Sequence, residues 1–294
     1  MGPCGPLNND PTIHEGRAKE MGKQRQTSSY QQTISTSYAR YLPTHQSKNL
    51  VKNEYDKVLE SHLFLKQKRD QSIKGRMVVG VNYQRGHINK TDATSPTAAL
   101  ESVLFTSTID AKEGRDVAII DIPNAFVTTR IENKKDVFTV RLRGKLAKLM
   151  VATDPEIYKK YFSVNCKGEL VIYAEALNAL YGIMKAALLF YLKFVKNLKS
   201  IGFELNPYEP CVANKIVDGA QLTVVWHIDD LKVSRVDAGV VTRMSVWLQK
   251  TCERLFDDGS GAMKLKRGKI HEYLGMQLDF SIVGKVKIAM FDYI

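Results

Sequence analysis

Residues 117–120, Val-Ala-Ile-Ile, form an uninterrupted apolar run that ends at the carboxylate of Asp121. Such a run is typical of a strand that is buried on both faces of a sheet. Two further apolar runs, within 222–236, flank Asp229 and Asp230 and predict a hairpin with both acids at its tip. The sequence therefore predicts a fold in which three carboxylates lie at the ends of core strands.

The rest of the sequence predicts a mixed α+β domain that follows a polar arm. Gln, Ser and Thr dominate residues 23–38, so we expect residues 1–54 to be a disordered or loosely attached arm. From 55 to 294 strands and helices are interspersed without strict alternation, which indicates the α+β class. The longest apolar run, 186–192, is far shorter than the ~20 residues of a membrane-spanning helix. We therefore expect no membrane partner.

Local patterns predict most elements of this domain. Residues 51–65 have mixed helical periodicity, and 75–81 resemble a short strand. Ser95 caps an expected helix that ends near Lys112, with Gly114 just beyond it. The remaining expected elements are a short helix at 155–162, a strand at 169–173, one or two helices within 174–201, a helix at 242–256 and a β-rich end from 264.

The chain carries 43 Lys and Arg against 31 Asp and Glu, a net charge of +12. This excess indicates either an anionic partner, such as nucleic acid, or simple solubility. Basic residues gather in two stretches: Lys264, Lys266, Arg267 and Lys269, and Arg141, Arg143, Lys145 and Lys148. Each stretch fits a phosphate-binding track or a solvated face.

The cysteines and the N-terminus bear on the cellular compartment. The 4 cysteines are scattered, with no zinc-ligand spacing among them, as expected for a reducing compartment. The N-terminus lacks the apolar stretch of a secretion signal. We therefore expect a cytoplasmic, intracellular protein.

Three acids at strand ends suit a divalent cation, because clustered carboxylates repel one another unless positive charge lies between them. Mg²⁺ prefers hard oxygen ligands and shares its remaining positions with water and substrate phosphates. Two such ions about 4 Å apart activate an attacking hydroxyl and neutralise the leaving oxygen of a phosphoryl displacement. The structural alternative is that Asp229 and Asp230 satisfy turn amides and that Asp121 caps a helix.

Six segments, in order along the chain, resemble motifs of the reverse transcriptases of copia-type LTR retrotransposons. Residues 120–126, IDIPNAF, are similar to the first catalytic motif, in which Ala-Phe follows the acid by four and five residues. His227 to Asp230 lies where that family has Tyr-x-Asp-Asp. The other segments are 74–76 (KGR, for Lys-Ala-Arg), 177–182 (LNALYG), 202–211 (GFELNPYEPC) and 273–276 (YLGM). The set covers residues 55–294.

The resemblance implies a right-hand polymerase with fingers and an α+β palm, whose antiparallel sheet packs on helices. Its reaction would be RNA- or DNA-templated addition of deoxynucleoside triphosphates to a primer. Asp121, Asp229 and Asp230 would be catalytic and would hold two Mg²⁺ ions, with Mn²⁺ as the alternative metal. The implied nucleotide contacts are Lys74, Arg76, Phe126 and Lys185, and the implied nucleic-acid contacts are Lys264, Lys266, Arg267, Lys269, Tyr273 and Gly275.

Several of these residues also have ordinary structural explanations. Phe126, which the resemblance places under the deoxyribose, where it would exclude a 2′-hydroxyl, would otherwise be a core aromatic residue. Lys74 and Arg76 would otherwise belong to a solvated basic face. Two residues depart from the family pattern, because His227 replaces its tyrosine and Lys185 its glutamine.

The chain ends soon after Tyr293, which leaves little room for a thumb. We therefore expect a fragment of a larger polyprotein, with the other parts of that polyprotein as partners, or a decayed copy. Virus-like particles would be a further location for such a fragment. Two other function classes remain open: a catalytically inactive, nucleic-acid-binding remnant, and a Mg²⁺-dependent nuclease. The nuclease lacks support, because no acid motif of the ribonuclease H type accompanies the three acids.

Overall fold

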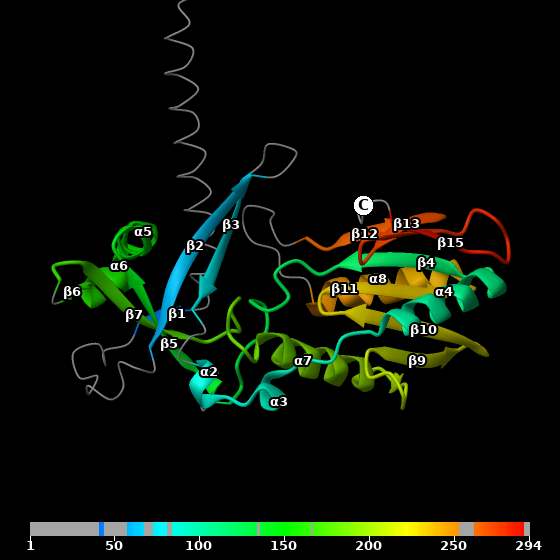
Figure 1. Ribbon diagram of the computed structural model, residues 1–294, viewed down its shortest axis with the longest axis horizontal. Helices are drawn as coiled ribbons and strands as arrows, with labels where there is room; N and C mark the ends of the chain where they lie inside the picture. Colours follow the sequence, from blue (N-terminus) through cyan, green and yellow to red (C-terminus); the bar gives the residue numbers. More distant parts are fainter. Residues whose placement is uncertain are drawn as a thin grey trace, which may run out of the picture. The chain divides into compact units, whose positions relative to one another are not determined.

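The computed structural model describes residues 41–43, 58–67, 73–80, 84–133, 136–165, 167–252 and 262–290. They divide into two compact units, Met1–Tyr83 with Val137–Gly182 and Gln84–Asp136 with Ile183–Ile294. Each unit combines helices with a sheet whose strands are mainly antiparallel (Figure 1). The predicted α+β class is confirmed.

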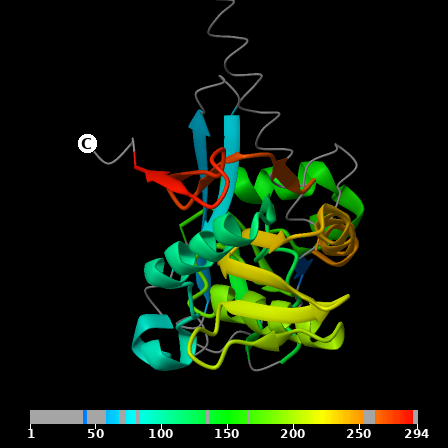
Figure 2. The ribbon, with the colours of Figure 1, turned by 90° about the vertical axis from the view of Figure 1, so that its right-hand side faces the viewer.

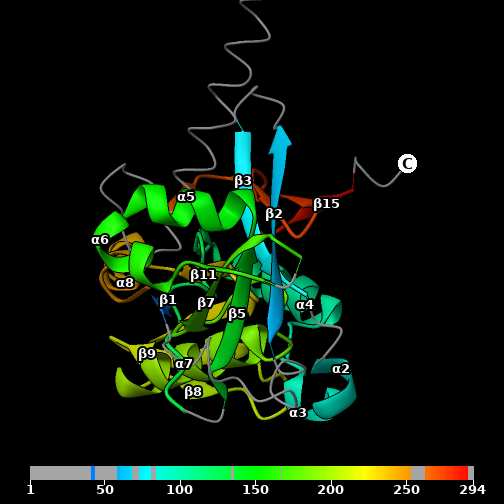
Figure 3. The same cartoon turned by 90° about the vertical axis from the view of Figure 1, so that its left-hand side faces the viewer.

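The first unit contains a sheet in the order β1-β7-β5-β2-β3, with β6 paired to β7. All its strand pairs are antiparallel except β2 with β5. Helix α5 packs against β5 and β7 (Figure 3). The elements are β1 (Tyr41–Pro43), β2 (Leu59–Gln67), β3 (Ile73–Val79), β5 (Phe138–Arg143), α5 (Lys145–Thr153), α6 (Pro155–Tyr158), the 3₁₀ helix η4 (Lys159–Tyr161), β6 (Ser163–Val164) and β7 (Leu170–Ala176).

Strand β2 corrects the helical periodicity expected at residues 51–65 from Leu59 onward, and residues 51–57 lie outside the described residues. Leu59 and Ser61 are buried, whereas His62 and Phe64 are exposed, which is the period of two that a strand produces. The buried Ser61 hydroxyl donates a hydrogen bond to the Arg141 carbonyl at 2.7 Å, so its burial leaves no unmet polar group. Because a phenylalanine of this strand is exposed and a serine is buried, the pattern of hydrophobic residues alone does not predict the strand.

Most of the predicted N-terminal arm lies outside the described residues. Within it, β1 (Tyr41–Pro43) pairs with β7, with Tyr41 opposite Ala176.

The backbone at Gly182 explains why the segment LNALYG ends in glycine. Gly182 has φ of +94°, and a Cβ there would lie 2.1 Å from the Val79 carbonyl oxygen, so only glycine fits at the end of LNALYG.

The second unit contains a six-stranded antiparallel sheet in the order β12-β4-β11-β10-β9-β8, and a separate sheet in the order β13-β14-β15. Its strands are β4 (Asp116–Asp121), β8 (Glu204–Leu205), β9 (Val212–Val217), β10 (Ala220–His227), β11 (Asp230–Arg235), β12 (Lys264–Arg267), β13 (Ile270–Tyr273), β14 (Met276–Asp279) and β15 (Lys287–Ala289). Its helices are α2 (Gln84–His87), α3 (Lys90–Ala93), α4 (Leu100–Glu113), α7 (Ala186–Ser200) and α8 (Ala238–Cys252).

Helices cover both faces of the six-stranded sheet (Figure 2). Asp110 of α4 accepts hydrogen bonds from Lys232 and Ser234, which project from one face of β11. Trp226 projects from the other face and meets Phe194 of α7 edge-on, with the ring centroids 5.2 Å apart. The sheet is therefore a buried central layer, which accounts for the apolar runs of β4 and β10.

Helix α4 begins at Leu100, later than the predicted start at Ser95. The Glu209 carboxylate accepts a hydrogen bond from the Ala99 amide at 3.0 Å and so satisfies this helix end from a distant part of the sequence. The predicted C-terminus is confirmed, because Gly114 ends the helix with φ of 64°. Within 174–201 the helix is confined to α7, since residues 170–176 complete β7.

Candidate active site

A row of four side chains crosses one end of the six-stranded sheet. Lys264 of β12 lies opposite Asp121 of β4, Asp121 lies opposite Asp230 of β11, and Asp230 lies opposite His227 of β10. Directly opposed residues on antiparallel strands share a face, with Cβ atoms about 4.5–5.5 Å apart. The fold therefore places the carboxylates of Asp121 and Asp230 side by side, with a basic residue at one end of the row and an imidazole at the other.

The third acid lies in the turn between β10 and β11. Ile228 and Asp229 form this two-residue turn, and Ile228 alone of the two has positive φ, at 59°. This is the pattern of a type II′ turn, and it strains a β-branched residue. The Asp229 carbonyl accepts a hydrogen bond from the Ile122 amide at 3.0 Å, which ties the turn to the end of β4. The predicted convergence of the three acids, two of them at a hairpin tip, is thus seen in the structure.

The acids of this row repel one another. Burial raises the pKa of the Asp230 carboxyl, the negative charges of Asp229 and Asp121 raise it further, and His227 opposes the shift. Lys264 Nζ lies 4.0 Å from Asp121 Oδ2, but the lysine side chain is 72% exposed, so solvent screens its charge. The site therefore has an excess of negative charge that a bound cation would offset.

The donor set fits Mg²⁺. Among the described residues, no three His, Cys, Asp or Glu side chains form a ready-made metal cage. Mg²⁺ does not need one, because it binds through one or two carboxylates and completes its shell with water and substrate phosphates. The paired carboxylates and the raised pKa of Asp230 provide both the ligand type and the electrostatic reason for such a site.

A family model described as reverse transcriptase (RNA-dependent DNA polymerase) matches residues 49–294 of this chain. The chain belongs to the reverse transcriptase family. None of the curated proteins matches its sequence. The region of this reverse transcriptase that matches the family model begins at residue 49, close to residue 55, where the region covered by the motif resemblance begins.

Two telomerase structures from Candida tropicalis are among the solved structures to which this chain is similar. The apo telomerase has a TM-score of 0.42 and 10% identity over 86% of this chain and 50% of that chain. The telomerase in complex with a TWJ fragment of telomeric RNA has a TM-score of 0.39 and 10% identity over 82% of this chain and 47% of that chain. This reverse transcriptase chain thus spans about half the length of the telomerase chains.

The residues with expected nucleotide contacts lie in different surroundings. Phe126 follows β4 in a turn, is half-buried and packs against the core of the second unit. Lys185 Nζ forms an ion pair with Asp136 Oδ1 at 2.8 Å, so part of its charge is already offset. The backbones of Lys74 and Arg76 lie on β3 of the first unit, but their side chains are outside the described residues.

The expected nucleic-acid track lies on β12, an edge strand next to β4. All four residues of β12 are exposed, and Lys269 just beyond it is exposed as well. Lys266 forms an ion pair with Glu272 at 3.4 Å, and Arg267 binds Asp116. In the first unit, Arg141 and Arg143 both bind Glu60, so this second basic stretch is partly neutralised.

Tyr273 requires a correction. Its side chain is only 2% exposed, so the ring is in the core and cannot make the expected contact with nucleic acid. The following Leu274 and Gly275, with φ of 51° and 78°, form the two-residue turn between β13 and β14. Gly275 is exposed at this turn, as a nucleic-acid contact requires.

A buried ion pair was not predicted from the sequence. Lys232 and Asp110 bind each other with both side chains fully buried, and Ser234 donates to the same carboxylate at 2.6 Å. The signal was present, because Lys232 and Ser234 interrupt an apolar strand with a period of two. Burial lowers the pKa of Lys232, and Asp110 opposes that shift.

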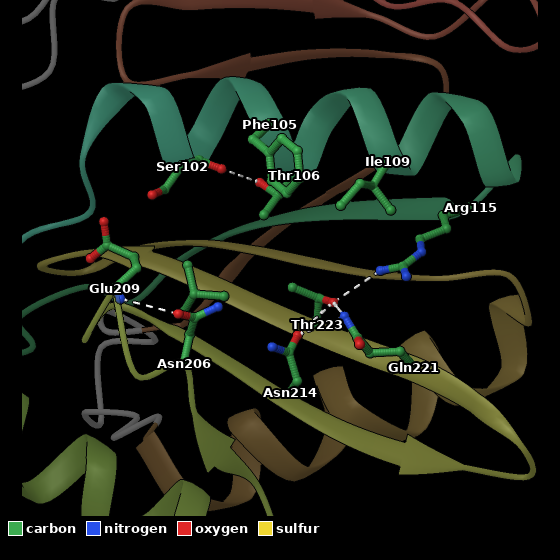
Figure 4. Close-up of a pocket in the computed structure, with 11 residues that line it drawn as sticks. Ser102, Phe105, Thr106, Ile109, Arg115, Asn206, Glu209, Asn214, Gln221 and Thr223 are labelled. Carbon is green, nitrogen blue, oxygen red and sulfur yellow. Dashed lines mark hydrogen bonds between the residues drawn. The ribbon is translucent and has the colours of Figure 1, made fainter.

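A cavity of about 220 Å³ lies between α4 and strands β9 and β10, and none of the acids of the row lines it (Figure 4). Its two charged side chains are engaged in the fold. Arg115 donates a hydrogen bond to Thr223 at 2.9 Å, and Glu209 accepts from the amides of Ala99 and Cys211. We therefore place the candidate active site at the acids.

None of the described helices is long and apolar enough to cross a membrane.

Proposed function

We propose that this chain is the RNA-directed DNA polymerase region of a copia-type LTR retrotransposon polyprotein. The observation that carries the proposal is the position of the three acids. Asp121 of β4 lies directly opposite Asp230 of β11, and Asp229 lies in the turn that precedes Asp230. Membership of the reverse transcriptase family supports the same reaction. On this proposal the second unit is the palm and the first unit is the fingers.

Each acid has a distinct role in the proposed reaction. Asp121 and Asp229 hold two Mg²⁺ ions, or Mn²⁺ in their place, and Asp230 supports them. When bound, the ions supply activation of the primer 3′-hydroxyl and neutralisation of the leaving pyrophosphate. The hydrogen bond from the Ile122 amide to the Asp229 carbonyl at 3.0 Å fixes the turn relative to the end of β4. The acids are thereby held in place before substrate binds.

Other residues would bind the substrates. Phe126 would lie under the deoxyribose, and Lys74, Arg76 and Lys185 would meet the triphosphate, which for Lys185 means leaving its ion pair with Asp136. The exposed basic residues of β12, together with Lys269, support binding of an RNA or DNA template with its primer. The remaining parts of the parent polyprotein would be protein partners.

Primer extension tests the proposal. The Asp229→Asn substitution is nearly isosteric and removes one negative charge, so we expect it to abolish nucleotide addition while duplex affinity is unchanged. The matched control is Asp279→Asn, an aspartate on β14 whose Oδ1 accepts a hydrogen bond from the Ser281 amide at 2.8 Å, a role that asparagine can also fill. This control should extend primers at the wild-type rate, and a chelator should stop both it and the wild type.

Three results would contradict the proposal. Extension that survives Asp229→Asn would mean that other carboxylates carry the reaction. A folded wild-type protein that binds duplex but never extends a primer would instead identify the inactive, nucleic-acid-binding remnant. Cleavage of the duplex in place of extension would identify a nuclease.

A further inference from the structure

The Tyr273 hydroxyl lies next to the backbone of the catalytic hairpin. Its oxygen is 3.3 Å from the Asp230 carbonyl oxygen and 3.5 Å from the Val225 carbonyl oxygen. Val225 lies on β10 and Asp230 on β11, so one hydroxyl reaches both arms of the hairpin. The tyrosine itself comes from β13, which belongs to a different sheet.

Packing fixes the position of this hydroxyl. The Tyr273 ring is 2% exposed and belongs to the same core cluster as Trp226 and Leu231, the pair next to the hairpin tip. The ring therefore cannot rotate away without opening the core. A phenylalanine would fill nearly the same space, so packing alone does not require the hydroxyl.

The hydroxyl is also chemically suited to this position, because a tyrosine O–H can donate one hydrogen bond. Carbonyl oxygens, which only accept, are matched partners for such a donor.

The hairpin tip needs external support. Ile228 has φ of 59°, a conformation that is costly for a β-branched residue and persists only where the surroundings hold it. The Asp230 side chain has only two rotatable bonds, so a shift of its backbone moves its carboxylate directly. A contact that fixes the Asp230 carbonyl therefore fixes the geometry of the acid row.

We propose that Tyr273 is a positioning residue, whose hydroxyl holds the backbone of Asp230 so that its carboxylate stays aligned with that of Asp121. This inference rests on the proposed function and deepens it. It replaces the direct nucleic-acid contact expected of Tyr273 with an indirect role in metal binding. It also assigns a task to the YLGM segment, which is to anchor the catalytic hairpin from a neighbouring sheet.

The test compares Tyr273→Phe with Tyr191→Phe. Tyr191 is the matched control, because its hydroxyl also donates to a backbone carbonyl, that of Pro210 at 3.2 Å, which belongs to neither strand of the catalytic hairpin. We expect Tyr273→Phe to lower kcat about fivefold, the effect of one lost hydrogen bond, and to raise the Mg²⁺ concentration for half-maximal rate. KM for deoxynucleotide and affinity for duplex should stay at wild-type values, and Tyr191→Phe should change none of these quantities.

Two measurements without catalysis separate this inference from the proposed function. Amide hydrogen exchange should quicken at residues 227–231 in Tyr273→Phe alone, and calorimetric titration with Mg²⁺ alone should show weaker binding. If the wild type extends no primer, the proposed function fails, and these two measurements still decide the role of Tyr273. Unchanged exchange and unchanged Mg²⁺ binding would overturn the inference. Exchange that quickens across the whole sheet, with a lower Tm, would make Tyr273 merely structural and would overturn it equally.

Discussion

At the scale of single residues, Phe126 is the position where packing and chemistry are most closely linked. Its ring is half-buried against the core, in the turn that follows β4. A side chain that is only partly buried can contact both the protein core and a ligand. Two roles were considered for Phe126 from the sequence, a core aromatic residue and a nucleotide contact. Its partial burial is compatible with both roles.

We predict that Phe126→Ala relaxes the choice of sugar. Deoxynucleotide addition should persist or weaken, whereas ribonucleotides should become acceptable, because the group that excludes the 2′-hydroxyl is gone. Primer extension with each nucleotide type measures the ratio of kcat/KM values. Phe105→Ala is the control, since that phenylalanine is 68% exposed on α4. Unchanged discrimination in Phe126→Ala would remove this residue from the nucleotide site.

The sequence predicted where the three acids lie in the fold, but it did not predict the surroundings of the other candidate site residues, for a physical reason. Asp121 and Asp230 end or begin apolar strands, and local patterning is enough to indicate such positions. The burial of Tyr273 and the ion pair of Lys185 with Asp136 depend on how distant segments pack. No local pattern encodes those contacts, so a residue can match a motif and still have a different role.

At the scale of elements, the β13–β14 hairpin carries a buried histidine. His271 is 1% exposed, and its Nε2 lies 3.0 Å from the Gly268 carbonyl oxygen. Its Nδ1 has no hydrogen-bond partner within the part of the chain that the structure describes. Burial lowers the pKa of His271, although the Gly268 carbonyl and the Asp116 charge oppose the shift. A proton on this ring would therefore be a buried charge with little compensation.

The sign of the resulting pH dependence follows from proton linkage. Unfolded His271 titrates near pH 6.5, whereas the folded residue titrates at lower pH. Between these values the unfolded state binds more protons, so stability falls as the pH drops below about 6.5. Above that pH both states are neutral, and His271 contributes no slope.

We predict that His271→Gln removes part of this slope. The free energy of unfolding, measured by urea denaturation between pH 5 and 7, should fall less steeply with acid than in the wild type. The difference is at most about 1.4 kcal/mol per pH unit, the effect of one proton. The control is His62→Gln, which makes the same substitution at an exposed histidine. Parallel curves for His271→Gln and the wild type would assign the acid sensitivity to other groups.

The elements show where sequence reasoning succeeds. Strand β4 and the β10–β11 hairpin were predicted, because a strand that is buried on both faces has an unambiguous composition. Strand β2 and the start of α4 were not, because Ser61 and Ala99 are satisfied by Arg141 and Glu209 from far along the chain. Long-range hydrogen bonds thus decided the elements that local propensity left open.

At the scale of the whole molecule, part of the positive charge of the chain lies on strand β12. This strand forms the edge of the sheet and pairs with β4, which places Lys264 beside Asp121. The run of charge is visible in the sequence, but its place next to the acids is not, because sheet pairing is set by the core. Lysines on an edge strand also discourage pairing with other chains, so the lysines of β12 have a structural explanation as well as a functional one.

We predict that the combined substitutions Lys264→Gln, Lys266→Gln and Lys269→Gln weaken duplex binding uniformly across sequences. Each phosphate contact that is lost should reduce the slope of log K against log salt by about 0.9, because fewer counterions are released. Arg267 is left intact, since it binds Asp116 and supports the strand. The control replaces three exposed lysines of α7 and α8, Lys196, Lys199 and Lys250, and so makes the same change in net charge. Filter binding over a range of salt concentrations should show a smaller slope for the β12 variant alone. An equal loss in both variants would mean that overall charge attracts the nucleic acid and that β12 forms no track, and β12 would then keep only its role at the sheet edge.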